Sequence, residues 1–161
     1  MTKIWGPPTW NFLHSFCARI EESKFQENKL SIIDFIRIIL SNLPCPVCSD
    51  HATKMFNSKI TRITNKNDLC LYFYHFHNEV TMRTNKFNKP KIPDKEILEI
   101  YKNNNVRKVF NIYYQNWEKS TSQKNVVTMT STFMKHNYIN NSIKWLKENN
   151  HLLEKGSFVP Y

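Results

Sequence analysis

Two cysteines separated by two residues, Cys45 and Cys48, are the residues of this sequence best suited to chemistry. The first stands between Pro44 and Pro46, where one helical pattern ends and another begins. Pro44 ends the first helix because proline has no N–H and disfavours helix in the residue before it, whereas Pro46 suits a first helical turn. The pair is therefore predicted at a helix N-terminus, where the dipole favours a thiolate and lowers the pKa of a thiol. Such an environment suits a redox-active disulfide.

A zinc site is the alternative use of the same cysteines. Thiolates at this spacing are common zinc ligands, and His51 follows Cys48 by three residues. Cys70 or His75 would complete a tetrahedral set. A thioredoxin-like arrangement is disfavoured, because no strand–helix–strand pattern surrounds the pair.

The elements that must hold the cysteines are helices. Apolar residues recur with a helical period and the chain contains only two glycines, so we predict an all-α fold. The segment Trp5–Thr9 is expected to be a turn, and residues 21–28, 57–67, 86–93 and 120–132 are expected to be polar connections. The expected helices, in chain order, cover residues 10–20, 30–43, 46–56, 69–83, 94–101, 106–117 and 133–149, with Asn67 or Asp68 capping the fourth and Asp94 the fifth.

Length and charge narrow the class of protein. The 161 residues suffice for one real hydrophobic core, and four cysteines at this length do not make a disulfide framework. No apolar run reaches the ~20 residues of a membrane span, and no signal peptide is recognisable, so a cytoplasmic protein is expected. The net charge of +10 is spread along the chain, which indicates a solvated surface rather than a nucleic-acid-binding module.

Three separated motifs, taken together, resemble those of a known protein family. The stretches Trp5-Gly6-Pro7-Pro8-Thr9-Trp10-Asn11-Phe12-Leu13-His14, Pro44-Cys45-Pro46-Val47-Cys48 and His77-Asn78-Glu79-Val80, the last followed by Arg83 and Lys86, resemble the Erv/ALR family of FAD-linked sulfhydryl oxidases in order and spacing. The resemblance covers residues 1–90. The compact Lys- and Asn-rich sequence looks most like members encoded by large DNA viruses, which would place it in the host cytoplasm or the virion.

The resemblance implies a four- or five-helix bundle over residues 1–93 that binds FAD, followed by a small helical extension over 94–161. The cofactor-binding residues it implies are Gly6, Trp10, His14, Cys48, His77, Asn78, Val80, Thr81 and Lys86. Departures from the family pattern are Ile20-Glu21 in place of Tyr-Pro, Thr81 in place of Asn, and Pro7 in place of Arg. No metal is implied.

The reaction implied is the oxidation of protein dithiols by molecular oxygen through FAD, giving hydrogen peroxide. Helix geometry puts Cys45 at an exposed corner, where a substrate thiolate attacks, and Cys48 one turn in, facing the flavin. No second CxxC is present, and Cys17 and Cys70 are expected to be buried thiols.

The assembly expected of the family is a homodimer through the first two helices. Six apolar residues in the second helix, too many for one buried face, support it: Leu30, Ile32, Ile33, Ile36, Ile39 and Leu40. The aromatic residues of the extension are too numerous for a disordered tail. Deleting residues 120–161 is nevertheless expected to leave flavin binding and thiol turnover in place.

Overall fold

The computed structural model describes residues 2–84, 96–122 and 129–158, and within these ranges the regular elements are helices. The α-helices are α1 (Thr2–Arg19), α2 (Glu22–Ser41), α3 (Pro46–Lys59), α4 (Lys66–Thr84), α5 (Ile97–Tyr101), α6 (Val106–Ser122) and α7 (Met129–Glu148), with short 3-10 helices η1 (Ile60–Arg62) and η3 (Asn150–Leu152). The prediction of an all-α fold is confirmed. None of the described helices is long and apolar enough to cross a membrane.

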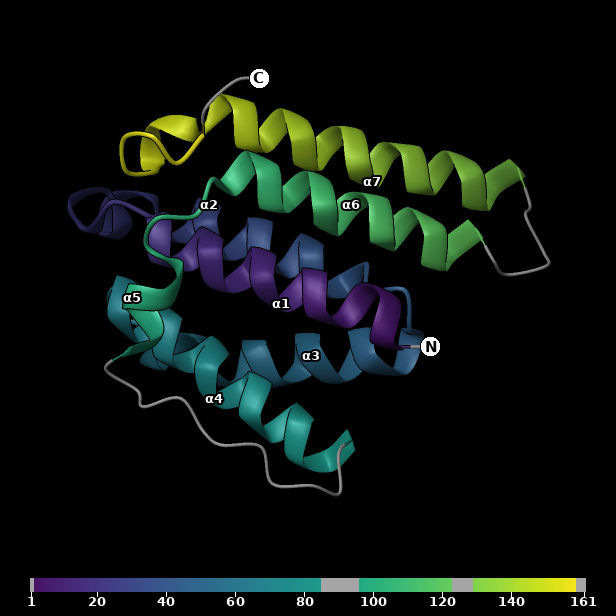
Figure 1. The fold of residues 1–161 in the computed structure, drawn as a ribbon, viewed down its shortest axis with the longest axis horizontal. Helices are drawn as coiled ribbons and strands as arrows, with labels where there is room; N and C mark the ends of the chain where they lie inside the picture. The colour runs from purple at the N-terminus through teal and green to yellow at the C-terminus, as the bar shows by residue number, and fades with distance from the viewer. Residues whose placement is uncertain (1, 85–95, 123–128, 159–161) are drawn as a thin grey trace.

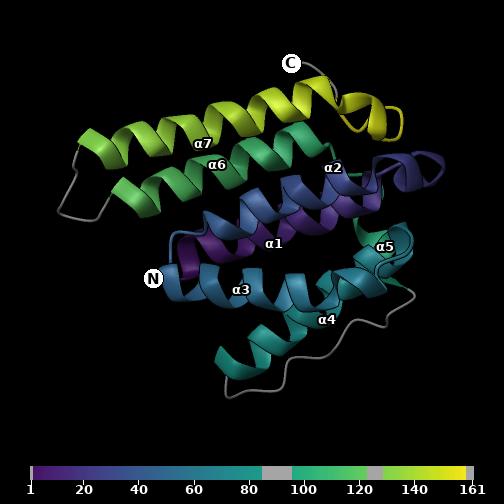
Figure 2. The same cartoon turned by 180° about the vertical axis from the view of Figure 1, so that it is seen from behind.

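The helices stack in three layers. The α6–α7 pair lies on the α1–α2 pair, which lies in turn on α3 and α4 (Figures 1 and 2). The short α5 closes one end by packing on α1 and α4. At the opposite end, Figure 1 shows the first turns of α1 and the start of α3, while α4 ends apart from them.

The predicted turn at Trp5–Thr9 was wrong, because α1 already begins at Thr2. Pro7 and Pro8 lie inside the helix. Their fixed φ suits helical backbone, but each lacks the N–H that would bond the carbonyl four residues earlier, so the second turn of α1 loses two backbone hydrogen bonds. The Thr9 hydroxyl donates to the Trp5 carbonyl at 2.7 Å and secures this turn.

The predicted polar connection over residues 21–28 was also wrong, because α2 begins at Glu22. Phe25, which is fully buried, anchors this polar first part of the helix. The connection from α1 shrinks to Ile20 and Glu21, which the end of the chain holds in place. The Glu21 N–H donates to the Leu152 carbonyl at 2.8 Å, and Ile20 forms a β-bridge with Leu153.

The remaining boundaries follow local chemistry. α3 starts at Pro46 and α6 at Val106, as predicted, whereas α7 starts four residues early, at Met129. The cap of α4 is Asn65 rather than Asn67 or Asp68: its side-chain oxygen accepts from the Asp68 N–H at 2.8 Å. Asp94, the predicted cap of α5, lies outside the described residues.

The hydrophobic core is continuous across the predicted boundary at residue 93. Phe12 of α1 stacks on Tyr113 of α6 with ring centroids 5.5 Å apart, and Phe35 of α2 lies against Trp145 of α7 at 4.1 Å, nearly parallel. Tyr113 is fully buried. The boundary at residue 93 therefore divides the sequence but not the core.

A buried arginine ties the end of the chain to α1. The Arg19 guanidinium, 8% exposed, donates to the carbonyls of Lys102 and Lys155 and to the Ser157 hydroxyl, and lies 3.6 Å from the Glu154 carboxylate. A buried cation is tolerated only when it is paired and hydrogen-bonded in this way. Arg19 thus joins the C-terminal segment to the residue that follows α5.

The apolar excess of α2, which supported the homodimer, is accounted for within one chain. Five of its six residues are at most 2% exposed, because α3, α7 and the core cover them; only Leu30 is open to solvent, at 78%. The apolar residues of α2 therefore no longer support a homodimer. We expect light scattering at micromolar concentration to report a monomer, and a dimeric mass would show that another face, such as the one around Leu30, is the interface.

Candidate functional site

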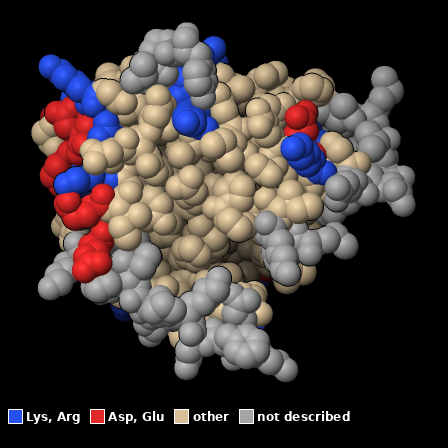
Figure 3. Space-filling model, viewed as in Figure 1, with Lys and Arg blue, Asp and Glu red and all other residues tan. Residues whose placement is uncertain are grey.

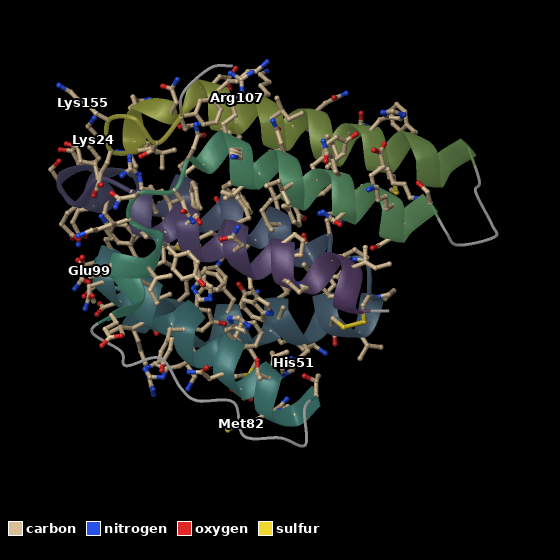
Figure 4. The ribbon with its side chains drawn as sticks, in the orientation of Figure 1. Lys24, His51, Met82, Glu99, Arg107 and Lys155 are labelled. Carbon is tan, nitrogen blue, oxygen red and sulfur yellow. A yellow bond between two sulfur atoms is a disulfide. The ribbon has the colours of Figure 1, made fainter. Side chains whose placement is uncertain are left out.

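The two cysteines form a disulfide at the corner between α2 and α3 (Figure 4). Cys45 is the N-cap of α3 and Pro46 its first residue. The Cys48 N–H points at Cys45 Sγ at 3.3 Å, and the Ser49 N–H donates to the Cys45 carbonyl at 2.9 Å. Both cysteines are half-buried. A thiolate released at this corner meets the positive end of the α3 dipole and a backbone donor, which makes the disulfide a competent electron acceptor.

Helix periodicity orients the second cysteine. His51 and Ala52 follow Cys48 at i+3 and i+4 and share its face of α3. Ala52 is 3% exposed, and the His51 ring lies 5.8 Å from Phe76 of α4. Cys48 is thus on the face of α3 that turns toward α4 and the body of the bundle.

A cluster of rings joins α1, α4 and α5. Trp10 and His77 lie face to face, with centroids 4.3 Å apart and planes 9° from parallel. His14 Nε2 is 3.0 Å from His77 Nδ1, a hydrogen bond between the two imidazoles. Phe76 meets the Trp10 ring edge-on at 5.5 Å, and Tyr101 stacks on His14 at 4.9 Å. The first and third motifs of the sequence, 63 residues apart at the two histidines, thus meet in space.

His14 is an uncharged member of this cluster. It is 3% exposed, and burial, followed by the proximity of His77, lowers the pKa of His14 to about 3. At neutral pH its imidazole is therefore neutral, so His14 Nε2 either donates to His77 Nδ1 or accepts from it, according to the tautomer. His14 supplies a planar, uncharged surface that bears a hydrogen-bonding edge.

Open space lies between α1 and α4, the two helices that contribute most of the ring cluster. The face seen in Figure 3 is hollowed where α1 and α4 approach each other, and mostly uncharged residues surround the recess. A Cβ added at Gly6 would meet no atom within 4 Å. Asn78, Val80 and Thr81 are half-buried on α4, in the turn that follows His77. Lys86 lies outside the described residues.

The zinc ligand set is not assembled. His51 Nε2 is 2.9 Å from Arg83 Nη1, and Arg83 also pairs with Glu79 at 2.5 Å. Cys70 is buried, whereas His75 on the same helix is exposed. Over residues 2–84, 96–122 and 129–158, no group of three His, Cys, Asp or Glu side chains lies close enough to hold a metal ion.

The two other cysteines are buried thiols, at 0% exposure for Cys17 and 4% for Cys70. Burial raises the pKa of both, that of Cys70 to about 12. We expect iodoacetamide to label only Cys45 and Cys48 in the reduced native protein, with Cys17 and Cys70 labelled after denaturation, as peptide mass spectrometry would show. A Cys45→Ser/Cys48→Ser variant should take up no label while folded; native labelling of Cys17 or Cys70 at the same rate would contradict this.

Sequence reasoning missed Tyr101, Phe76 and the His51–Arg83 contact. Tyr101 reaches His14 only because α5 folds back onto α1, where the Arg19 bond to the Lys102 carbonyl holds it. Its aromatic type at the end of a short helix was the one available signal. Phe76 directly precedes His77, the first residue of the third motif, but its residue type and position are typical of a core residue.

Comparison with known proteins assigns the chain to a family. The model of the Erv1/Alr family matches residues 7–102, which include the ring cluster and the disulfide. The chain belongs to the Erv1/Alr family. The match ends at Lys102, so all of α6 and α7 lie beyond the part that this Erv1/Alr protein shares with the family model.

Three relatives illustrate the similarity of this Erv1/Alr chain to named proteins. It is 30% identical over 102 residues to protein 096R of Invertebrate iridescent virus 3, across 62% of this chain and 67% of that protein, whose name is that of a FAD-linked sulfhydryl oxidase. It is 29% identical to the FAD-linked sulfhydryl oxidase of African swine fever virus (51% and 69%) and 26% identical to that of Arabidopsis thaliana (50% and 42%). No solved structure matches significantly.

Proposed function

We propose that this protein is a FAD-linked sulfhydryl oxidase that forms disulfides in protein substrates. The observation that carries the proposal is the Cys45–Cys48 disulfide at the start of α3, with the face of α3 beyond Cys48 turned toward α4, the helix that contributes His77 to the Trp10–His77 stack. The names of the viral and plant relatives support both the activity and the cofactor.

The residues around the recess suit a flavin dinucleotide. Trp10 and His77 are half-buried and offer flat faces for a planar ring system, and we assign the buried His14 to the layer behind them. Asn78 and Thr81 bring an amide and a hydroxyl for the polar arm of such a ligand. The open space beside Gly6 leaves room for close approach to the α1 backbone. We assign Val80 to the same side of the cofactor site as Asn78 and Thr81. Cys48 is assigned to the side of the site where the disulfide lies. Lys86 is assigned to the phosphates of the cofactor because of its positive charge.

The cysteines carry out the exchange with substrate. A substrate thiolate attacks Cys45 Sγ, a new substrate–Cys45 disulfide forms, and Cys48 leaves as a thiolate. The second substrate thiol, deprotonated, then attacks the substrate sulfur of this mixed disulfide and releases Cys45 as a thiolate. The substrate departs with its own disulfide, and the two electrons remain on the Cys45–Cys48 pair. The helix dipole stabilises each thiolate as it forms.

When bound, FAD would supply the chemistry that takes two electrons from the Cys45–Cys48 pair to molecular oxygen, giving hydrogen peroxide. The contribution of the chain is to hold Cys48 on the inward face of α3 and to keep His14 of the ring cluster uncharged. The partners in this proposal are protein dithiols and oxygen. The viral relatives favour the host cytoplasm or the virion as the place of action.

Asn78→Ala tests the cofactor assignment. We expect the purified variant to retain at least fivefold less FAD per chain, by its flavin absorbance, because the amide that would bond the polar arm is lost. Helical content by circular dichroism should be unchanged, since Asn78 is only half-buried. Asn116→Ala, a half-buried asparagine of α6, is the matched control and should keep its FAD. A full complement of FAD in Asn78→Ala would show that the site is wrongly assigned.

A further inference from the structure

A groove begins directly beside the disulfide. It has a volume of about 490 Å³ and is lined by residues from the end of α2 and from α3, namely Ser41, Asn42, Leu43, Pro46, Ser49, Asp50 and Thr53. Leu43 and Pro46 flank the Pro44–Cys45 pair in the chain. The volume is within the range, roughly 300–1,000 Å³, of pockets that bind ligands.

The groove and the ring cluster lie on different sides of α3. Pro46, Ser49, Asp50 and Thr53 are spaced by three or four residues and form one stripe of the helix. Cys48, with His51 and Ala52, belongs to the opposite side of α3, which faces the bundle. A molecule in the groove therefore reaches the Cys45 end of the disulfide without entering the recess between α1 and α4.

The groove presents hydrogen-bond acceptors. Most of its side-chain donors are already used internally: the Ser49 hydroxyl donates to the Leu40 carbonyl at 2.8 Å, and the Ser41 hydroxyl and the Asn42 amide donate to the Ile38 carbonyl at 3.1 and 2.8 Å. The Thr53 hydroxyl is the exception, because it is buried and has no hydrogen-bond partner among the described residues. The serine and asparagine side chains that donate internally still have oxygen lone pairs, which can accept hydrogen bonds from a ligand.

Asp50 adds negative charge to these acceptors. It is the one ionised side chain in the lining, and its carboxylate is 63% exposed, although it pairs with Lys54 at 2.8 Å. Such a surface complements the backbone N–H groups of an extended chain and the cationic heads of Lys or Arg, and it repels carboxylates.

We propose that this groove docks the extended polypeptide segment that carries the substrate's attacking cysteine, with a preference for Lys or Arg over Asp or Glu beside it. The inference rests on the proposed function and names the substrate class of the same disulfide. The groove sets which dithiols reach Cys45, and small dithiols such as dithiothreitol do not need it.

The first test fills the groove. Ser41→Trp introduces a ring at its edge, and Ser58→Trp is the matched control. Both serines are exposed, lie in the last turn of a helix and donate to a carbonyl three residues earlier, but Ser58 is outside the groove. We expect Ser41→Trp to lower the ratio of kcat/KM for a Lys-flanked dicysteine peptide to that for dithiothreitol at least tenfold, and Ser58→Trp to leave this ratio unchanged. An unchanged ratio in Ser41→Trp would overturn the proposal.

The second test concerns charge. The wild-type protein should prefer the Lys-flanked peptide to its Glu-flanked counterpart about fivefold, and Asp50→Asn should bring this preference close to one. Asp34→Asn, which removes another exposed, paired carboxylate on α2, should leave the preference intact. A wild-type preference for the Glu peptide would overturn the proposal.

Binding of the diserine form of the Lys peptide, measured by fluorescence anisotropy, separates docking from chemistry. We expect Ser41→Trp to weaken this binding at least fivefold. If the FAD-loaded protein oxidises neither dithiothreitol nor peptide, the proposed function fails, and the binding result still decides for or against the groove.

Discussion

A chain that ends at residue 119 is expected to lose its cooperative fold and its flavin. The cut removes α7, η3 and the C-terminal segment, and with them five side chains that are at most 6% exposed: Tyr138, Ile139, Leu146, Leu152 and Leu153. Burial of a large apolar side chain contributes roughly 1.5–3 kcal/mol, so their loss costs on the order of 10 kcal/mol. That is comparable with the whole stability of a domain, about 5–15 kcal/mol. This expectation reverses the one drawn from the sequence.

The loss of hydrogen-bond partners adds to this cost. Arg19 would lose the Lys155 carbonyl, the Ser157 hydroxyl and the Glu154 carboxylate, and would remain a buried cation with few partners. Because Arg19 also binds the Lys102 carbonyl, the position of Tyr101 over His14 would be lost with it. Thermal melting by circular dichroism and flavin absorbance of the purified chain measure both effects.

Point variants in α7 make the same test without truncation. Trp145→Ala should lower the free energy of unfolding by about 3–5 kcal/mol, because the ring packs on Phe35 and Phe16. Phe133→Ala is the matched control: Phe133 is 68% exposed, and its loss should change stability by less than about 0.5 kcal/mol. A chain ending at residue 119 that melts cooperatively at the wild-type temperature and keeps its FAD would show that the two parts fold separately.

Cys45→Ala and Cys48→Ala should both abolish dithiol oxidation, at least a thousandfold, but differ in colour. Cys45→Ala keeps Cys48 on the inward face of α3, where under the proposed function its thiolate would lie beside oxidised flavin and should give a long-wavelength absorption band. The band should fade as pH falls through the pKa of the thiol, since only the thiolate donates electron density. Cys48→Ala should lack the band, because Cys45 lies at the helix start on the side of the groove.

The control for both variants is Val47→Ala. Val47 stands between the cysteines and is 80% exposed, so its truncation should leave turnover and spectrum unchanged. A band in Cys48→Ala and none in Cys45→Ala would reverse the two roles.

Local chemistry sufficed to predict the corner that carries the disulfide. Pro44 cannot continue a helix and Pro46 starts one well, so Cys45 and Cys48 were expected at a helix N-terminus from the residue types alone. The same holds for the long helices, whose apolar period is strong. Prediction from local chemistry failed at Trp5–Thr9 and at residues 21–28. There the prolines and polar residues lie near helix starts, and tertiary contacts keep them helical.

What only the tertiary structure decided is how distant segments meet. The sequence allowed the apolar surface of α2 to be covered by a second copy of the chain or by the chain's own later helices, because hydrophobic patterning specifies a face but not its partner. Packing of Trp145 on Phe35 selects the chain's own α7. Likewise, Trp10, His14 and His77 could be recognised as motif residues, but their contact, and the addition of Tyr101 to it, depends on α5 folding back onto α1 and on the buried Arg19 that holds the turn after α5 there.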